Sequence, residues 1–128
     1  MSMEEENKAL IHHVFELQDK EKTPDSYFNI CDSNYVEHRL GKDDVSLDEV
    51  KQEIMNPSQY TDYSLTVDHL LAEEDKVVYS VTHRYIRVEI GKKIRLTSTC
   101  MLRMANGKIM ENWVLGGYLE SDGKQIMR

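Results

Sequence analysis

The chain has 128 residues, of which 40% are hydrophobic and 30% are charged, and its formal net charge is −7. This length and composition predict a single globular domain over residues 1–128 and argue against a disordered chain. A nucleic-acid-binding protein would show a basic face, and none is visible in this acidic chain. No run approaches the roughly 18 apolar residues of a membrane span.

The first part of the chain has the residue spacing of helices. Ser2 and Glu5 fit a capping box, and apolar residues recur at helical spacing over residues 10–17. Thr23-Pro24 indicates the start of a second helix, because proline is well placed at the first helical position. We expect this helix to stop at residues 32–34, which read Asp-Ser-Asn.

A short strand and a third helix are expected next. Residues 35–39 favour a strand and residues 41–44 a polar loop. Ser46 and Glu49 fit a second capping box, which opens a helix. That helix is expected to end at Asn56-Pro57, since proline cannot continue it.

From residue 63 onward, apolar and polar residues alternate with a period of two, which predicts strands. Asn106-Gly107 is the strongest hairpin signal in the chain, and turns are also expected at Gly91-Lys92 and within residues 73–76. Helices followed by an antiparallel meander define an α+β fold, with the N-terminal helices packed on the sheet. The predicted later strands are 77–90, 94–105 and 109–119.

The Asn106-Gly107 turn predicts which side chains face the helices. A two-residue turn pairs Ala105 with Lys108, and residues directly opposite one another share a face of the sheet. Uninterrupted pairing then places Leu102 opposite Glu111 and Cys100 opposite Trp113. The helix-facing set predicted in this way is Leu96, Ser98, Cys100, Leu102, Met104, Ile109, Glu111, Trp113 and Leu115.

The other two turns extend this prediction to three more side chains and leave a fourth open. A Gly91-Lys92 turn puts His83 and Tyr85 on the helix-facing side, together with Tyr79. His69 joins them if the loop at residues 73–76 has three residues, but it turns away if the loop has two or four.

Glu111 is the informative member of the helix-facing set. An unpaired buried carboxylate costs several kcal/mol, on the order of a whole domain's stability. Three outcomes are therefore open: Glu111 meets a histidine or an arginine, it borders a wet cavity, or it lies at the frayed edge of the sheet. The second outcome describes a ligand pocket.

The two cysteines and the N-terminus bear on location. Cys31 and Cys100 show no metal-ligand spacing, so neither a zinc site nor a disulfide framework is expected. The N-terminal segment is acidic and polar and lacks the features of a signal peptide. We therefore expect a cytoplasmic protein.

Four segments resemble one known family. Asn7 with the apolar residues that follow it is similar to the family's opening helix, and Tyr35-Val36-Glu37-His38 is similar to its Y-V-x-H segment. Residues 72–78 resemble an acidic turn that leads into a long strand. Residues 106–113, Asn-Gly-Lys-Ile-Met-Glu-Asn-Trp, resemble a D-G-K-I-x-E-x-W hairpin. On these segments the chain resembles the nuclear-transport-factor-2-like superfamily and, within it, the SnoaL-like polyketide cyclase group.

The resemblance implies a cone-shaped, cystatin-like α+β barrel, in which a strongly bent antiparallel sheet and helices enclose a deep apolar pocket. It also implies a homodimer formed through the outer face of the sheet. The cyclases of this group close a carbon ring by aldol chemistry without metal or cofactor, using a strand histidine and an aspartate four residues after the tryptophan. His83 matches the histidine, whereas Gly117 stands where the aspartate is expected.

The resulting hypothesis is a pocket for an apolar, carbonyl-bearing small molecule, with proton transfer of the isomerase or cyclase type. His83 would move the proton, Glu111 would tune it or replace the missing aspartate, and Tyr79 or Tyr85 would steady an oxyanion. The other residues expected to line the pocket are Tyr35, His38, His69, Ser98, Cys100 and Trp113.

Alternatives of other classes remain open. His83 is equally consistent with a histidine at the edge of the core, and Glu111 with a structural partner of an arginine. Loss of the aspartate at Gly117 favours a non-catalytic pocket. A structural dimer module would use Met101, Met110, Val114 and Tyr118. An epoxide-opening Asp–Arg–Asp site finds no matching residues in the sequence.

Overall fold

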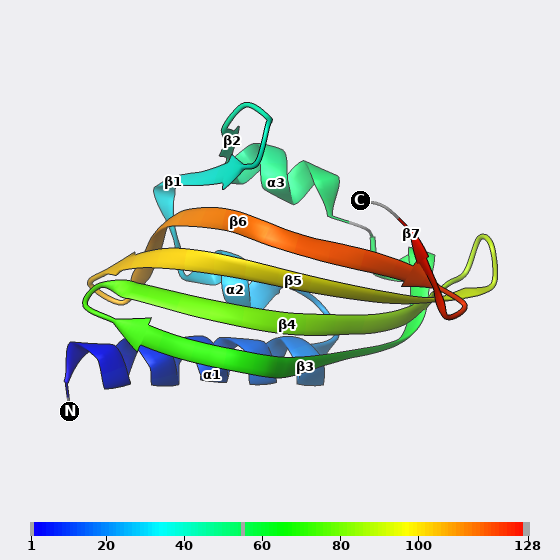
Figure 1. The fold of residues 1–128 in the computed structure, drawn as a ribbon, viewed down its shortest axis with the longest axis horizontal. Helices are drawn as coiled ribbons and strands as arrows, with labels where there is room; N and C mark the ends of the chain where they lie inside the picture. The colour runs from blue at the N-terminus through cyan, green and yellow to red at the C-terminus, as the bar shows by residue number, and fades with distance from the viewer. Residues whose placement is uncertain (1, 55, 127–128) are drawn as a thin grey trace.

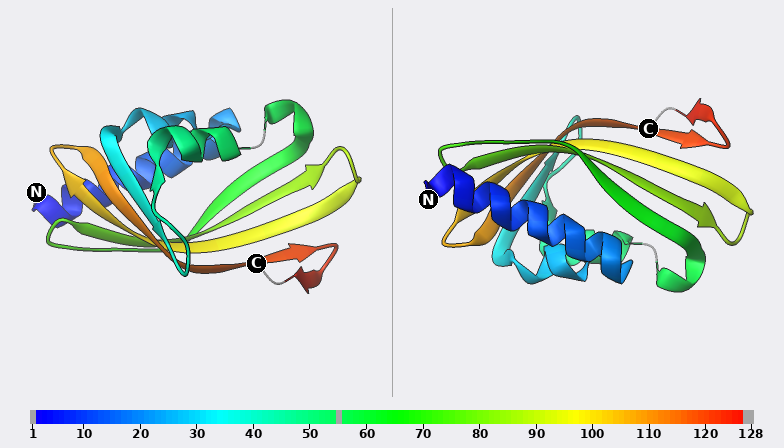
Figure 2. Two further views of the ribbon diagram at one scale, coloured as in Figure 1. Left: turned by 90° about the horizontal axis from the view of Figure 1, so that it is seen from above. Right: turned by 90° about the horizontal axis from the view of Figure 1, so that it is seen from below.

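Three helices lie on the concave side of one curved sheet in the computed structural model, which describes residues 2–54 and 56–126 (Figures 1 and 2). The main sheet has the order β2-β1-β6-β5-β4-β3, and β7 pairs with β6. This arrangement confirms the predicted α+β fold. The elements are α1 (Met3–Glu21), α2 (Asp25–Asn29), β1 (Cys31–Arg39), β2 (Val45–Ser46), α3 (Leu47–Glu53), a 3₁₀ turn (Pro57–Gln59), β3 (Tyr60–Glu73), β4 (Lys76–Arg87), β5 (Lys92–Ala105), β6 (Lys108–Ser121) and β7 (Lys124–Ile126).

The predicted helix caps are present. The Glu5 backbone N–H donates to Ser2 Oγ at 3.1 Å, and the Ser46–Glu49 capping box opens α3 with both of its hydrogen bonds. Helix α3 ends at Glu53, earlier than expected. Among the described residues, no helix combines the length and apolar content needed to cross a bilayer.

The sheet is mixed, whereas a wholly antiparallel sheet was expected. Strand β1 begins at Cys31 and runs parallel to β6, and a register irregularity lies between Cys31 and Val36. Residues 32–34 were expected to end a helix, but they lie within this strand. Asp32 still makes a local turn-like contact there, because its Oδ2 accepts from the Asn34 N–H at 2.9 Å.

The Asn106-Gly107 hairpin forms as predicted, with Ala105 opposite Lys108 and Met104 opposite Ile109. The pairing then shifts, because Met110 is an extra residue that forms a β-bulge. Leu102 therefore lies opposite Asn112 instead of Glu111. A one-residue shift moves the following side chains to the other face, so the predicted faces of β6 are reversed beyond this bulge. A second extra residue, Leu115, restores them, and Gly117 lies opposite Ser98.

The other two hairpins also settle side-chain directions. The β4–β5 loop is longer than expected, so His83 lies opposite Leu96 rather than Cys100. The offset is an even number of residues, and His83 keeps its predicted face. The β3–β4 turn has two residues and pairs His69 with Ser80, which directs His69 away from the helices.

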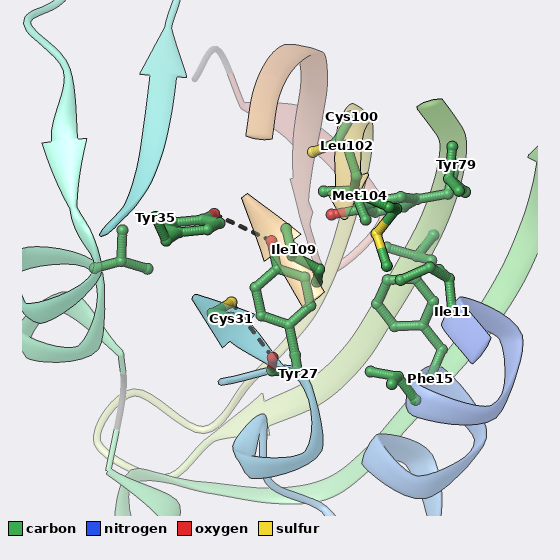
Figure 3. Packing of buried hydrophobic residues seen from close by; sticks show 14 of the residues in the cluster. Ile11, Phe15, Tyr27, Cys31, Tyr35, Tyr79, Cys100, Leu102, Met104 and Ile109 are labelled. Atoms are coloured by element: carbon green, nitrogen blue, oxygen red, sulfur yellow. Dashed lines mark hydrogen bonds between the residues drawn. The ribbon is translucent and has the colours of Figure 1, made fainter. Parts of the chain in front are cut away.

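The buried core fills one end of the concave face, near the Asn106-Gly107 hairpin. Ile11 and Phe15 of α1 pack there against Leu102, Met104 and Ile109 of the sheet (Figure 3). Toward the β4–β5 loop the same face carries more polar side chains and is not filled. The solid core therefore supports one end of the sheet, and the other end is hollowed.

Candidate functional site

A cavity of about 410 Å³ lies between the concave face of the sheet and the helices. A smaller hollow of about 200 Å³ shares several of its lining residues, including Gln18, His83 and Tyr85. The walls are largely apolar, with a few polar groups converging on the space, which is the usual character of a small-molecule pocket.

Five residues predicted for the pocket lie on its wall. They come from two neighbouring strands, β4 and β5, whose alternation directs them toward the helices. These residues are Tyr79, His83, Tyr85, Ser98 and Cys100. Tyr35 lies directly behind the wall and contacts the pocket through Glu37, to which its hydroxyl donates at 2.9 Å.

Glu111, Trp113 and His38 lie elsewhere, contrary to prediction. The bulge at Met110 turns Glu111 and Trp113 to the outer face of the sheet, and strand alternation places His38 beside them. His38 Nε2 lies 2.7 Å from Glu111 Oε2, and its ring stacks on Trp113 with centroids 5.1 Å apart. Arg103 Nε donates to Glu111 Oε1 at 2.7 Å, so Glu111 has the arginine partner that was its structural alternative.

Two further side chains do not lie where the pocket and dimer hypotheses placed them. His69 would have joined the pocket with a three-residue loop, but the β3–β4 turn has two residues and His69 is exposed on the outer side of β3. Val114, which the dimer module would use on the outer face of the sheet, lines the pocket, since it follows the bulge at Met110.

A cluster of charged side chains on the outer face links β1 to β6 and β5. It consists of His38, Asp44, Glu111 and Arg103. The hydrogen bonds to Glu111 and then to Asp44 raise the pKa of His38 above its ordinary value. The hydrogen bonds from His38 and Arg103 lower the pKa of Glu111. These groups therefore stabilise the fold when both the imidazolium and the carboxylate are charged.

Replacing His38 with glutamine is expected to cost about 1 kcal/mol of unfolding free energy at pH 6. The cost should shrink at pH 9, because a group with a raised pKa stabilises below its unfolded pKa and loses that effect as pH rises through the folded pKa. Urea unfolding at both pH values measures this difference. His69→Gln, at an exposed histidine, is the matched control; equal costs of His38→Gln at the two pH values would contradict the prediction.

A buried carboxylate dominates the polar part of the pocket. Glu37 of β1 is 8% exposed, and its Oε1 accepts from Tyr35 Oη at 2.9 Å and from Asn112 Nδ2 at 3.3 Å. Its Oε2 accepts from Arg39 Nε at 2.7 Å. The protein therefore supplies hydrogen bonds to both carboxylate oxygens, as a buried charge requires.

Arg39 carries this network to the mouth of the pocket. Its Nη2 lies 2.7 Å from Glu53 Oε2 at the end of α3, so one guanidinium bridges two carboxylates. Glu53 and then Glu37 raise the pKa of Arg39, and the hydrogen bond from Arg39 lowers the pKa of Glu53. No such carboxylate–guanidinium–carboxylate arrangement was found in the sequence; the structure contains one, built with glutamates.

His83 is held in place on the opposite wall of the pocket. Gln18 Nε2 of α1 donates to Tyr63 Oη at 3.0 Å, and Tyr63 Oη lies 2.7 Å from His83 Nδ1. This chain of contacts fixes the plane of the imidazole. Orientation of a ring nitrogen by a second residue is the usual support of a proton-transferring histidine.

The pocket tyrosines remain protonated. Burial raises the pKa of Tyr79 and Tyr63 above the ordinary tyrosine value. The Tyr79 ring packs against Phe15 with centroids 4.8 Å apart, which fixes its position. A phenol with a raised pKa keeps its proton at neutral pH and can donate a hydrogen bond.

The two cysteines are buried and are not joined by a disulfide. Burial raises the pKa of Cys31 to about 12, so this thiol is unreactive at neutral pH. Across residues 2–54 and 56–126, no group of three or more histidine, cysteine or acidic side chains is placed to hold a metal ion.

Sequence reasoning missed Glu37, Arg39, Asn112, Gln18 and Tyr63. A signal for the first two was present, since Tyr35, Glu37 and Arg39 alternate on one strand and must share a face. Asn112 was hidden by the bulge. The contact between Gln18 and Tyr63 joins a helix to a distant strand, which no local pattern indicates.

Comparison with protein families gives one match, and it covers most of the chain. The model for the SnoaL-like polyketide cyclase family matches residues 13–121. A comparison with curated proteins finds no match.

Solved structures with the same fold carry descriptions of different chemistries. AclR from Streptomyces galilaeus, a proposed hydroxylase, superposes with a TM-score of 0.75 at 22% identity, over 88% of this chain and 78% of that one. A proposed SnoaL-like polyketide cyclase from Jannaschia sp. CCS1 gives 0.68 at 11%, over 95% and 89%. An LEH-like epoxide hydrolase from M. tuberculosis gives 0.67 at 10%, over 93% and 86%. At these identities the likeness shows the fold and leaves the reaction open.

Proposed function

Because the chain belongs to the SnoaL-like polyketide cyclase family, we propose that it binds an apolar, carbonyl-bearing small molecule and transfers a proton at the carbon next to the carbonyl. The observation that carries this proposal is the juxtaposition of an oriented imidazole and a buried carboxylate on one largely apolar cavity. Such a space holds a neutral ring system while the polar groups set its orientation.

His83 is the proposed proton-transfer residue. The imidazole side chain changes charge between about pH 5 and 8, which suits it to act as base and then as acid. We assign the transfer to Nε2, the ring nitrogen that Tyr63 does not engage. As the C–H proton moves to His83, the electron pair forms an enolate. Where a C=C bond extends the enolate, return of the proton to the far carbon isomerises the ligand. Alternatively, the enolate carbon attacks a second carbonyl and closes a ring, and the proton returns from His83 to the alkoxide oxygen that forms.

Glu37 is the proposed pocket carboxylate, the role that the sequence had suggested for Glu111. It is paired with Arg39 and accepts two further hydrogen bonds, so in this reaction it acts by positioning and by charge. Tyr79 and Tyr85 are the proposed donors to the carbonyl oxygen as negative charge develops on it.

The alternative function is a pocket that binds a ligand without catalysing a reaction, and the absence of the family aspartate favours it. Gly117 pairs with Ser98, which lines the cavity, so a side chain at this position would also face the pocket. A retained cavity with no carboxylate at Gly117 favours carrying or sensing a ligand.

Deuterium exchange tests the proposal directly. 2-Acetylnaphthalene has an apolar body and exchangeable protons next to its carbonyl, and NMR in D₂O follows their loss. The protein should accelerate exchange above the buffer rate, and Ser98→Phe, which fills part of the cavity, should abolish the acceleration. Binding without acceleration favours the non-catalytic alternative, and absence of binding contradicts both.

A second candidate function is the opening of an epoxide by water. The observation in its favour is the Glu37–Arg39–Glu53 arrangement at the pocket, and one structure with this fold is described as an epoxide hydrolase. A water that loses its proton to Glu37 would attack a ring carbon, and the opened oxygen would regain a proton from solvent. Diol formation from styrene oxide, lost in Glu37→Gln, would favour this reaction over proton transfer at carbon.

We also propose a homodimer formed through the outer face of the sheet. Leu71, Leu115 and Tyr118 are exposed apolar side chains of strands β3 and β6. Sedimentation should give twice the chain mass of 15.0 kDa at micromolar concentration. Leu115→Glu should give a folded monomer, because a charge would be buried at the interface, whereas Leu40→Glu, at an exposed residue beyond the end of β1, should not. A wild-type monomer would contradict the dimer.

A further inference from the structure

Asn112 has a buried polar atom whose hydrogen bonding the fold does not complete. Asn112 is 4% exposed and lines the cavity, and its Oδ1 has no hydrogen-bond partner within the described part of the chain. Buried side-chain oxygens are almost always paired, so an unpaired oxygen on a residue that lines a cavity indicates a missing donor.

The orientation of the Asn112 amide is fixed by its neighbours. Its Nδ2 donates to Glu37 Oε1 at 3.3 Å and to Tyr27 Oη at 3.3 Å. Exchanging the two ends of the amide would place Oδ1 against the Glu37 carboxylate, where two acceptors repel. The carboxylate therefore holds Oδ1 as the end of the amide without a partner.

The charges around Asn112 define what the donor can be. Arg39 lies between two carboxylates, Glu37 and Glu53, so its single positive charge is more than balanced. An anionic ligand would meet a net negative charge here, because Arg39 is the only arginine or lysine among the described residues that line the cavity. A neutral O–H group satisfies an amide oxygen without adding charge.

We propose that Asn112 forms a hydroxyl-binding subsite, in which Oδ1 accepts a hydrogen bond from a phenol, enol or alcohol of the ligand. This inference rests on the proposed function and narrows its ligand class to neutral hydroxy-carbonyl compounds. The hydroxyl lies at the Asn112 wall, and the carbonyl lies toward His83 and the pocket tyrosines. A ligand without the hydroxyl leaves the amide oxygen unpaired and binds more weakly.

A matched set of naphthalenes tests the subsite. The probes are 6-acetyl-2-naphthol, its methyl ether and unsubstituted 2-acetylnaphthalene, with binding measured by calorimetry at a pH where the naphthol is un-ionised. The wild-type protein should bind the naphthol at least about tenfold more tightly than either compound that lacks the donor. Asn112→Ala should lose this preference while keeping its affinity for the other two.

The outcomes separate this inference from the proposed function. If neither the naphthol nor its relatives bind, both fall. If all three bind equally, the pocket stands and the hydroxyl subsite is wrong, because an ordered water alone would satisfy Oδ1. A naphthol preference that survives in Asn112→Ala also overturns the assignment.

Asn112→Ala also removes the contacts to Glu37 and Tyr27, so the wild-type protein supplies a second measurement if that variant does not fold. The NMR signals of the Asn112 side-chain amide should move with the naphthol and much less with the ether. Equal movement would overturn the assignment.

Discussion

Replacing Arg39 with methionine is expected to lower the free energy of unfolding by about 3 kcal/mol or more, because it leaves the Glu37 carboxylate buried without its cation. Because Glu37 is 8% exposed, water compensates only in part for the lost partner. Arg39 also joins β1 to the end of α3 through Glu53. The variant should therefore unfold at lower urea concentration and at lower temperature.

Two companion variants make this prediction specific. Arg39→Lys keeps the charge but loses the planar fork that bridges two carboxylates, and it should cost less than methionine. Adding Glu37→Gln to Arg39→Met removes the unpaired charge and should recover much of the loss. A double variant as unstable as Arg39→Met would show that lost packing, rather than the buried charge, causes the effect.

Replacing His83 with alanine is expected to reduce deuterium exchange of 2-acetylnaphthalene by about 10²-fold or more, if the protein accelerates it as proposed. General acid–base residues contribute roughly 10²–10⁴-fold. NMR measures the exchange rates of the wild-type protein and of His83→Ala at one pH.

Residues behind His83 give the graded control. Tyr63→Phe removes the hydroxyl that lies 2.7 Å from Nδ1 and should reduce exchange less than His83→Ala does, because it disturbs orientation alone. His38→Gln changes a histidine on the outer face and should leave exchange unaltered. Unchanged exchange in His83→Ala would remove His83 from the mechanism.

The parts of the fold that could be predicted are those that depend on neighbouring residues. Ser2 and Ser46 cap their helices through residues three positions away, and Asn106-Gly107 adopts the positive φ values that a tight hairpin requires. The parallel pairing of β1 with β6 could not be read in this way, because it joins residues about 75 positions apart, such as Val36 and Glu111.

The candidate site was also predicted correctly only where local counting along the strands holds. His83 was placed on the correct face because its hairpin offset is even, whereas Glu111 and Trp113 were misplaced by one extra residue. Met110 is neither a glycine nor a proline, so nothing in its chemistry marks a bulge. Counting outward from a turn is reliable only until the ladder is first interrupted.

The bulge at Met110 has a consequence for how this scaffold can change. A point substitution alters one side chain of the cavity, but deletion of Met110 would rotate the segment that follows it by half a turn. The acid and the indole of residues 111 and 113 would then exchange sides with the amide of residue 112. Length variation in this strand, rather than replacement of single residues, is therefore the shortest genetic route to a different pocket chemistry in this chain.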